Sequence, residues 1–278
     1  MSPGWAGPVW GEPSAATEAA VPLRVRASAS QACYRADGGQ SAEFVVLAAS
    51  VAGVAHRLSG RRCEDAYAWA LPRSGRLAMI VADGVSTAGR GGEGADIAVN
   101  AACEHLLSAE GWGEMECLAA LRAASEAVSG AGGRSAAELS TTLVVALVAA
   151  SGTGAEVCLA RGGDSSAFVL VGAGWEELFP GRAEEELRGS VIGVLPLGSR
   201  DAVETASLAL PAGAALVLLT DGLADPLRDG PSTVAPALAE ILSGGPSGGL
   251  TPLALAAAAD FSRRGCQDDR TVLAAWPR

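Results

Sequence analysis

The sequence predicts an α+β protein in which mostly antiparallel β-sheets carry helices on their outer faces. Two observations indicate this fold class. Short apolar runs come in pairs separated by turn residues, which is typical of β-hairpins. Helical patterns occur in two groups, each after a set of strands, whereas a parallel sheet would alternate single strands with single helices. We expect one large domain over residues 43–278.

Residues 1–42 are predicted to form an irregular N-terminal extension. Prolines recur along this stretch among Gly, Ser and Ala, and no helical or strand period is sustained. Such a composition buries too little apolar surface to specify a regular element.

The expected elements after this extension follow from runs and periods of apolar residues. Strands are expected at residues 43–53, 66–71, 77–82, 140–149, 155–160, 166–172, 175–179, 205–210, 214–220 and 271–276. Helices are expected at residues 93–107, 114–128, 234–242 and 251–263. The strands at 205–210 and 214–220 are predicted to pair as a hairpin. The glycine-rich segments 89–94 and 181–197 are expected to be a loop and a flap.

Composition argues against two classes of partner. The chain has 20 basic residues, all of them arginine, and 31 acidic residues, which gives a net charge of −11. This charge disfavours a nucleic-acid backbone or an anionic membrane as the main partner. The most apolar run, Leu208–Leu219, is interrupted by Pro211 and Gly213 and is too short to span a bilayer.

The cysteines and the N-terminal segment predict a cytoplasmic location. The 6 cysteines are far apart, with no C-x-x-C pair, which fits buried thiols in a reducing compartment. The N-terminal segment lacks the basic start and apolar core of a signal peptide. We therefore expect a soluble, cytoplasmic protein.

A predicted hairpin within residues 56–94 lies at the centre of the candidate site. Its strands, Ala66–Leu71 and Leu77–Ala82, flank a turn that contains proline, serine and glycine. If the last residue of the first strand faces the first residue of the second, Asp65 lies opposite Asp83, and Glu64 lies opposite Gly84. Opposed Cα atoms in paired strands are about 4.5–5.5 Å apart. This register therefore gathers carboxylates at the open end of the hairpin.

Carboxylates this close repel, and one is largely protonated unless a cation lies between them. A bound hard metal ion is the simplest explanation of such a cluster. The alternative is that Glu-Asp before a strand and Asp-Gly after one are ordinary turn residues.

More acidic residues stand at the ends of apolar strands. Clusters with oxygen ligands alone suit Mg²⁺ or Mn²⁺, whereas zinc would favour His or Cys. Each acid taken singly also fits an ordinary turn, but the joint pattern favours a metal site. The strand-end acids are Asp83, Asp164, Asp221, Asp268 and Asp269.

Six motifs in chain order resemble those of the metal-dependent protein Ser/Thr phosphatases of the protein phosphatase 2C (PPM) family, in its bacterial form. Each motif alone is weakly specific, whereas six in order at compatible spacing are strongly so. The resemblance extends from about residue 43 to residue 277. The motifs are G-x-x-H-x-x-x-G-x-x-C-E-D-A (Gly53–Ala66), VADGVS (Val81–Ser86), STTLV (Ser140–Val144), GGDSSAF (Gly162–Phe168), LLTDGL (Leu218–Leu223) and DDRTVL (Asp268–Leu273).

The resemblance implies a four-layer α/β/β/α sandwich with two Mn²⁺ or Mg²⁺ ions in a cleft at one end. Asp164 matches the acid that helps hold a third, weaker ion in bacterial members, and Asp65 matches an acid that binds metal through water. The positions that match the main ligands are Glu64, Asp83 and the carbonyl of Gly84 for one ion, and Asp83, Asp221 and Asp268 for the other.

The resemblance also implies the reaction. A water that bridges the two ions would attack the phosphorus of phosphoserine or phosphothreonine while the ions neutralise the phosphoryl oxygens. The substrate would be a phosphorylated protein from a Ser/Thr kinase pathway.

The sequence departs from the family pattern at two positions. Gly60 occupies the place of the phosphate-binding arginine of animal members, and Val85 the place of their leaving-group histidine. His56 is a candidate for that second role, although a lone histidine is more often structural. The arginines that could bind phosphate instead are Arg57, Arg61 and Arg62.

Two alternatives share this fold. One is a pseudophosphatase that binds a phosphoprotein or a kinase without turnover. The other is an anti-sigma-pathway phosphatase, which usually carries an extra sensor domain. Degenerate members usually lack a metal ligand, and the presence of the full set favours an active enzyme.

Overall fold

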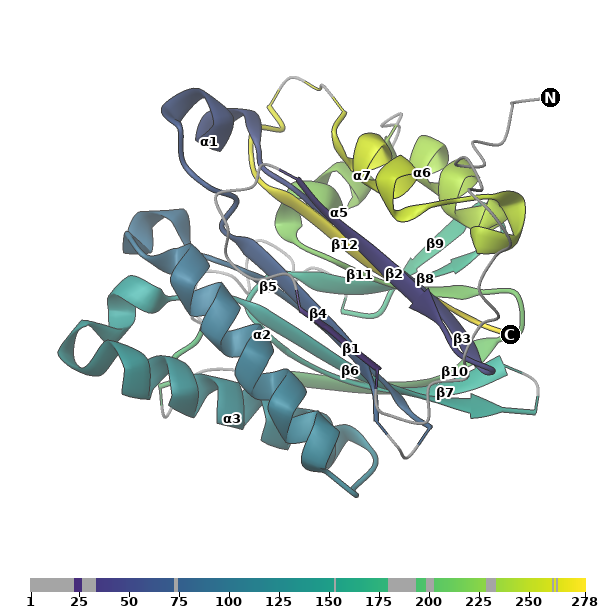
Figure 1. The fold of residues 1–278 in the computed structure, drawn as a ribbon, viewed down its shortest axis with the longest axis horizontal. Coiled ribbons are helices and arrows are strands. Elements are labelled where there is room, and N and C mark those ends of the chain that lie inside the picture. The colour runs from purple at the N-terminus through teal and green to yellow at the C-terminus, as the bar shows by residue number, and fades with distance from the viewer. Residues whose placement is uncertain are drawn as a thin grey trace, which may run out of the picture.

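The computed structural model describes residues 23–26, 34–72, 75–152, 154–179, 194–198, 203–228, 234–261, 263 and 265–278. Within these residues, two 6-stranded sheets pack face to face, with helices on both outer faces (Figure 1). Every strand pairing in the two sheets is antiparallel. The predicted α+β class and the four-layer α/β/β/α sandwich are confirmed.

The first sheet has the strand order β1-β4-β5-β6-β7-β10. Helices α2 (Gly91–Ser108) and α3 (Glu114–Gly132) cover its outer face (Figure 1). The short helix η1 (Ser86–Ala88) contacts α2, and η2 (Gly133–Leu139) contacts both α2 and α3. Its strands are β1 (Leu23–Arg26), β4 (Asp65–Leu71), β5 (Leu77–Asp83), β6 (Leu143–Ser151), β7 (Gly154–Gly162) and β10 (Glu204–Pro211).

The second sheet has the strand order β2-β3-β12-β11-β8-β9. Its outer face carries α5 (Asp221–Arg228), α6 (Val234–Gly244), η3 (Pro246–Gly248) and α7 (Pro252–Ala259). Helix α1 (Val54–Ser59) lies beyond the ends of the sheets, near the start of β12 (Figure 1). The strands are β2 (Tyr34–Gln40), β3 (Phe44–Val51), β8 (Ser166–Val171), β9 (Gly174–Glu177), β11 (Ala215–Leu219) and β12 (Arg270–Pro277).

Side-chain size along the strands determines how the layers pack. Successive side chains of a strand point to opposite faces. On β4, the alanines at positions 66, 68 and 70 pack with the residues of α2 and α3. Tyr67 and Trp69, which alternate with them, fill the core between the two sheets. Small residues therefore let the helices approach the sheet closely, and large ones fill the space between the sheets.

The predicted hairpin of residues 205–210 and 214–220 is wrong. Strand β10 pairs with β7 in the first sheet, whereas β11 pairs with β8 and β12 in the second. The short turn between them crosses from one sheet to the other. In the sequence this crossing is indistinguishable from a hairpin, because both consist of two apolar runs around a tight turn.

The prediction that residues 1–42 are irregular is wrong for two segments. Leu23–Arg26 forms β1 against β4, and Tyr34–Gln40 forms β2, which pairs along its whole length with β3. The glycines and aspartate of β2 lower its strand propensity, and its backbone pairing with β3 overrides this preference.

The remaining predicted elements differ from the structure mainly at their ends. Helix α2 begins at Gly91, inside the expected loop, and α7 ends at Ala259, before the expected residue 263. Most of the expected flap, residues 181–193, lies outside the described residues. No helix in the described part of the chain is long and apolar enough to cross a membrane.

The pairing of β2 generates a first prediction. Removal of residues 1–42 exposes the edge of β3 and should lower the melting temperature by about 5 °C or more, a loss of about 2 kcal/mol in a domain of this size. Removal of residues 1–22 retains every described strand and serves as the control. Equal melting temperatures for the two truncations, measured by circular dichroism, would contradict a stabilising role for β2.

Candidate metal centre

The β4–β5 hairpin has the register that the sequence predicts. Asp65 pairs with Asp83 at the open end of the hairpin. One position further along, the backbone N–H of Gly84 donates to the carbonyl of Glu64 at 3.2 Å. The two acids therefore lie directly opposite each other on neighbouring strands.

The alternation of side chains also sets the direction of both carboxylates. Asp65 has the same parity as Tyr67 and Trp69, and Asp83 the same parity as Met79 and Val81, and these four apolar residues lie in the core between the sheets. Both acids consequently project into the space between the two sheets, at its open end.

The second sheet supplies acids at the same end. Asp221 is the first residue of α5 and follows β11, and Asp268 and Asp269 precede β12, the neighbour of β11. Asp221 and Asp268 both act on the carboxyl of Asp83 electrostatically. Asp164 is exposed in the turn between β7 and β8 and acts on Asp221.

Glu64, Asp65, Asp83, Asp221 and Asp268 form an acidic cluster at this end of the sheets, and their proximity alters their protonation. Burial, followed by the charges of Asp65 and Asp221, raises the pKa of Asp83 well above its usual range. Burial, followed by nearby carboxylates, also raises the pKa of Asp221 to about 6, although a hydrogen bond with Asp83 opposes this shift. Burial and the charge of Asp269 raise the pKa of Asp65, although Thr220 donates a hydrogen bond to its carboxylate.

Three of these acids keep buried oxygens to which no described residue donates a hydrogen bond. They are Oε2 of Glu64, Oδ1 of Asp65 and Oδ1 of Asp221. A buried carboxylate oxygen without a donor is unfavourable unless a cation or water satisfies it. Among the described residues, no group of three His, Cys, Asp or Glu side chains is already arranged as a metal site. The unsatisfied oxygens and the raised pKa values nevertheless fit a divalent cation, because both reflect missing positive charge.

Gly84 is required by the close approach of α2. A Cβ atom at this position would lie 2.2 Å from the carbonyl carbon of Gly91, the first residue of the helix. Any larger residue would displace the start of α2 and, with it, the backbone next to Asp83.

The Ser-Thr-Thr motif before β6 holds the backbone of Asp83. The Thr142 hydroxyl accepts from the Asp83 N–H at 3.0 Å, and the Thr141 hydroxyl donates to the Asp83 carbonyl at 2.8 Å. The Thr142 hydroxyl also contacts the Ser165 hydroxyl at 2.7 Å. This contact links the turn that carries Asp164 to the backbone of Asp83. This motif therefore fixes the position of Asp83 relative to the β7–β8 turn.

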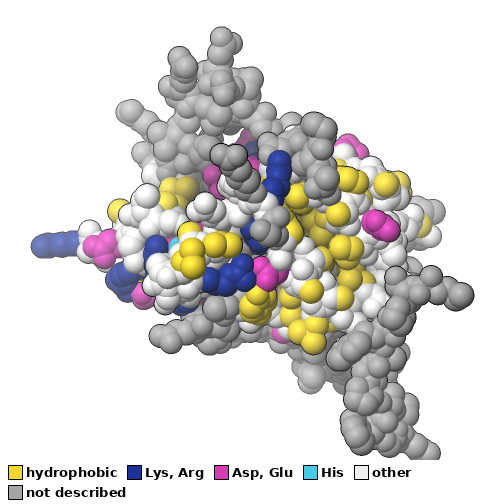
Figure 2. Space-filling view, turned by 90° about the horizontal axis from the view of Figure 1, so that it is seen from above, with side chains coloured by type: hydrophobic (Ala, Val, Ile, Leu, Met, Phe, Trp, Pro, Cys, Tyr) yellow, Lys and Arg dark blue, Asp and Glu magenta, His cyan; other side chains and the backbone are white. Residues whose placement is uncertain are grey.

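The three candidate phosphate-binding arginines are all paired with acids. Arg57 binds Asp260 through both of its terminal nitrogens. Arg62 binds Asp96 at 3.2 Å. Arg61, whose side chain is 42% exposed, binds Oε1 of Glu64 at 2.5 Å. Figure 2 accordingly shows basic and acidic side chains interspersed around the small area of histidine that reaches this face.

Asp269 is buried next to the acidic cluster, and its role is not predictable from the sequence. Its carboxylate accepts from the N–H of Gly53 at 2.6 Å and from the N–H of Glu64 at 2.5 Å, and it binds Nδ1 of His56 at 2.9 Å. The sequence places Asp268 and Asp269 at the start of a strand, but no feature of it indicates that Asp269 joins three segments.

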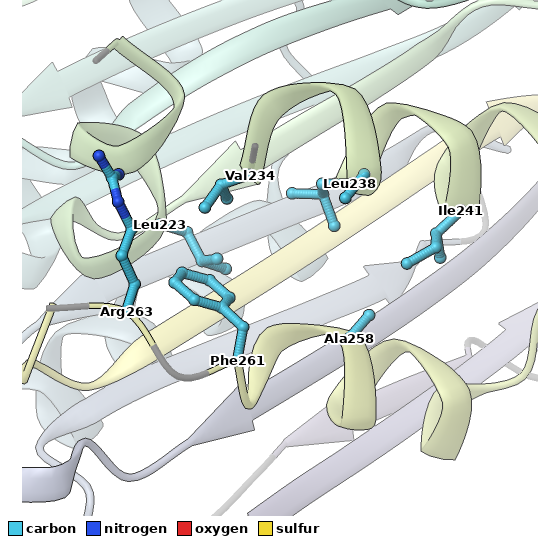
Figure 3. Close-up of a pocket in the computed structure, with 8 residues that line it drawn as sticks. Leu223, Val234, Leu238, Ile241, Ala258, Phe261 and Arg263 are labelled. Atoms are coloured by element: carbon cyan, nitrogen blue, oxygen red, sulfur yellow. The ribbon is translucent and has the colours of Figure 1, made fainter. Parts of the chain in front are cut away.

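Two hollows lie near α5. A cleft of about 290 Å³ is lined by Asp221, Asp225, Gln267 and Asp268 and opens beside the acidic cluster. A second cavity of about 270 Å³ is lined by apolar side chains of α5, α6 and α7 that face one another, with Arg263 at one side (Figure 3). The first hollow is lined by carboxylates, which binding of a divalent cation requires, and we take it as the cleft of the site.

Comparison with known proteins identifies the family. A family model described as protein phosphatase 2C matches residues 52–247, which is more than half of the chain. The chain belongs to the protein phosphatase 2C family. Its enzyme class is therefore that of the protein serine/threonine phosphatases, as the six motifs predict. No curated protein matches the chain.

Solved structures show the same fold at low identity. PppA of Pseudomonas aeruginosa, a regulatory component of its T6SS, has a TM-score of 0.58 and 22% identity, over 84% of this chain and 98% of that chain. The S. agalactiae serine/threonine phosphatase has a TM-score of 0.61 and 14% identity, over 84% and 100%. The catalytic domain of the phosphatase PstP, solved with 2 manganese ions, has a TM-score of 0.57 and 20% identity, over 84% and 98%.

The raised pKa of Asp83 predicts how stability depends on pH without metal. The folded-state pKa of Asp83 lies above its unfolded value near 3.9. The free energy of unfolding therefore falls as the pH rises from the unfolded pKa to the folded-state pKa, because the carboxylate must then ionise inside the fold. Asp83→Asn in EDTA should therefore raise the melting temperature at pH 7 by about 3–6 °C, which is about 1–2 kcal/mol.

The same substitution should have almost no effect on the melting temperature near pH 4, where the wild-type carboxylate is already protonated in the fold. Glu240→Gln, at an exposed carboxylate on α6 and away from the cleft, serves as the control. A variant that melts below wild type at pH 7 in EDTA would show that the carboxylates do not repel.

Proposed function

We propose that this phosphatase hydrolyses phosphoserine and phosphothreonine in proteins with the help of two Mn²⁺ or Mg²⁺ ions held by the acidic cluster. The observation that carries this proposal is the closeness of Asp65, Asp83 and Asp221, three acids with raised pKa values, two of which retain unsatisfied buried oxygens. The manganese in the PstP structure supports the same choice of ion.

Each acid has a separate task in this proposal. Glu64, Asp83 and the carbonyl of Gly84 would hold one ion, and Asp83, Asp221 and Asp268 the other. Asp83 is suited to the shared position because the carboxyls of both Asp221 and Asp268 act on it. Asp65, which projects between the two sheets, would bind a metal ion through a water molecule. The exposed Asp164 would help to hold a weaker third ion.

When bound, such ions would supply an activated water for attack on phosphorus and would neutralise charge on the phosphoryl oxygens. The residues of the chain hold the acids in place: Thr141 and Thr142 fix the backbone of Asp83, and Asp269 fixes the backbone of Glu64. The cleft beside Asp221 and Asp268 would receive the phosphorylated residue of the substrate protein.

The experiment that tests this function is hydrolysis of p-nitrophenyl phosphate after EDTA treatment, with Mn²⁺, Mg²⁺ and Zn²⁺ restored separately. We expect activity with Mn²⁺ or Mg²⁺ and not with Zn²⁺, because the proposed ligands are all oxygen atoms. Full activity after exhaustive EDTA treatment would contradict metal dependence. Absence of turnover at saturating Mn²⁺ would instead support the pseudophosphatase alternative.

Calorimetric titration with Mn²⁺ separates the roles of the acids. Asp83→Asn should lose binding of both main ions, because it removes the charge that both share. Asp164→Asn is the matched control and should retain binding of two ions. Wild-type affinity for two ions in Asp83→Asn would refute the shared position.

Arg61 is the arginine that we assign to phosphate binding. It is the most exposed of the three, and its partner Glu64 is a proposed metal ligand, so its guanidinium becomes available once Glu64 binds an ion. Arg57, by contrast, is held by Asp260 and lies over the ring of Tyr34, 5.9 Å from its centroid.

Arg61→Ala should raise KM for p-nitrophenyl phosphate by about tenfold, as expected for loss of a charged hydrogen bond. Arg57→Ala should change KM by less than about twofold while lowering the melting temperature, because its ion pair joins α1 to Asp260. The reverse pattern of KM values would assign phosphate binding to Arg57.

A further inference from the structure

The network around Asp269 points to a role for His56 other than proton donation to a leaving group. His56 lies on α1, and both of its ring nitrogens face carboxylates: Nδ1 lies 2.9 Å from Oδ2 of Asp269, and Nε2 lies 3.8 Å from Oε2 of Glu64. The exposed fraction of His56 is 6%, that of Glu64 is 6% and that of Asp269 is 2%. A ring buried between two acids is poorly placed to reach a substrate oxygen.

Asp269 joins three segments that are distant in sequence. Its Oδ1 binds the N–H of Gly53, immediately before α1, and its Oδ2 binds the N–H of Glu64, immediately before β4. The third partner, His56, comes from α1 itself. All three groups can donate to an ionised carboxylate, which has lone pairs for each of them.

The backbone at Gly53 packs tightly against the segment that precedes β12. A Cβ atom at Gly53 would lie 2.2 Å from the carbonyl oxygen of Gln267, in the segment that leads into β12. The chain before α1 therefore passes directly against the segment that carries Asp268 and Asp269. Movement of Asp269 would shift the loop between Gly53 and Glu64 together with α1.

We propose that Asp269 and His56 are positioning residues for Glu64. Asp269 fixes the backbone of Glu64 through its N–H and holds the His56 ring, and that ring limits where the Glu64 carboxylate can lie. The arrangement is a chain from carboxylate to imidazole to the carboxylate of a proposed metal ligand. It rests on the proposed function, because Glu64 must be a metal ligand for its position to matter in this way.

The test is calorimetric titration of the full-length protein with Mn²⁺ for His56→Gln and Asp269→Asn. Loss of a group that orients a metal ligand typically weakens metal binding by about 10–100-fold. We expect a loss of this size in both variants. Asp269→Asn replaces one accepting oxygen by a donor, so at least one of the three bonds to this side chain must break.

The matched control is His105→Gln, since His105 is the only other histidine of the chain. It pairs with Glu116 between α2 and α3, at 2.8 Å, on the outer helical layer. This variant should bind Mn²⁺ as wild type does. Melting curves in EDTA identify any variant that does not fold, and His56→Gln keeps the proposal testable if Asp269→Asn fails to fold.

Turnover at saturating Mn²⁺ separates positioning from acid catalysis. A positioning residue can be compensated by excess metal, so kcat of His56→Gln should return to within about threefold of wild type with both p-nitrophenyl phosphate and phenyl phosphate. A leaving-group acid predicts unchanged Mn²⁺ affinity and a selective loss with phenyl phosphate, whose leaving group is the stronger base.

The outcomes distinguish the positioning role from the proposed function. Tight Mn²⁺ binding by wild type with equally tight binding by both variants overturns the positioning role alone. A selective loss of phenyl phosphate turnover overturns it in favour of acid catalysis by His56. Failure of wild type to bind Mn²⁺ overturns the proposed function and, with it, the positioning role.

Discussion

The opposition of Asp65 and Asp83 is the constraint on which the rest of the site depends. Two carboxylates on paired strands repel, and burial makes their ionised forms more costly still. Their register is held by the apolar residues of β4 and β5, which pair along the hairpin. A slip of one residue would turn Tyr67 and Trp69 from the core between the sheets toward the helices. Packing of the sandwich therefore keeps the acids together against their own repulsion.

The acids come from both sheets. Asp65 and Asp83 belong to the first sheet, and Asp221 and Asp268 lie at the ends of neighbouring strands of the second. The complete cluster consequently exists only when the two sheets are packed. Family membership explains why these residue types occur in this order, and the packing explains why six motifs spread over the chain meet at one end of the molecule.

The sequence was most informative where the relevant interaction is local. The β4–β5 register follows from a short turn and two apolar runs, and it placed Asp65 opposite Asp83 correctly. The sequence was uninformative where a partner is chosen by tertiary packing. Nothing local distinguishes a hairpin from the crossing between β10 and β11, and the weak strand pattern of β2 conceals its pairing with β3.

The same limit applies to the candidate site. Acids at strand ends could be identified by type and position, and the family resemblance supplied their expected roles. The pairing of Arg57 with Asp260 and the three bonds of Asp269 join residues about 200 positions apart, as between His56 and Asp269 with a separation of 213. Contacts of this kind depend on how α1 docks against the start of β12, which no local pattern encodes.

The crossing between β10 and β11 has a consequence for how the protein folds. It ties the edge of one sheet to the middle of the other through a very short connection, and β12, which follows every other strand in sequence, lies between β3 and β11 in the second sheet. This short connection couples the formation of the two sheets. Long-range pairings of this kind slow folding, because the chain loses the entropy of loop closure before the stabilising contacts form. The sandwich should therefore be lost in one cooperative transition, with no half of it persisting as an independent unit.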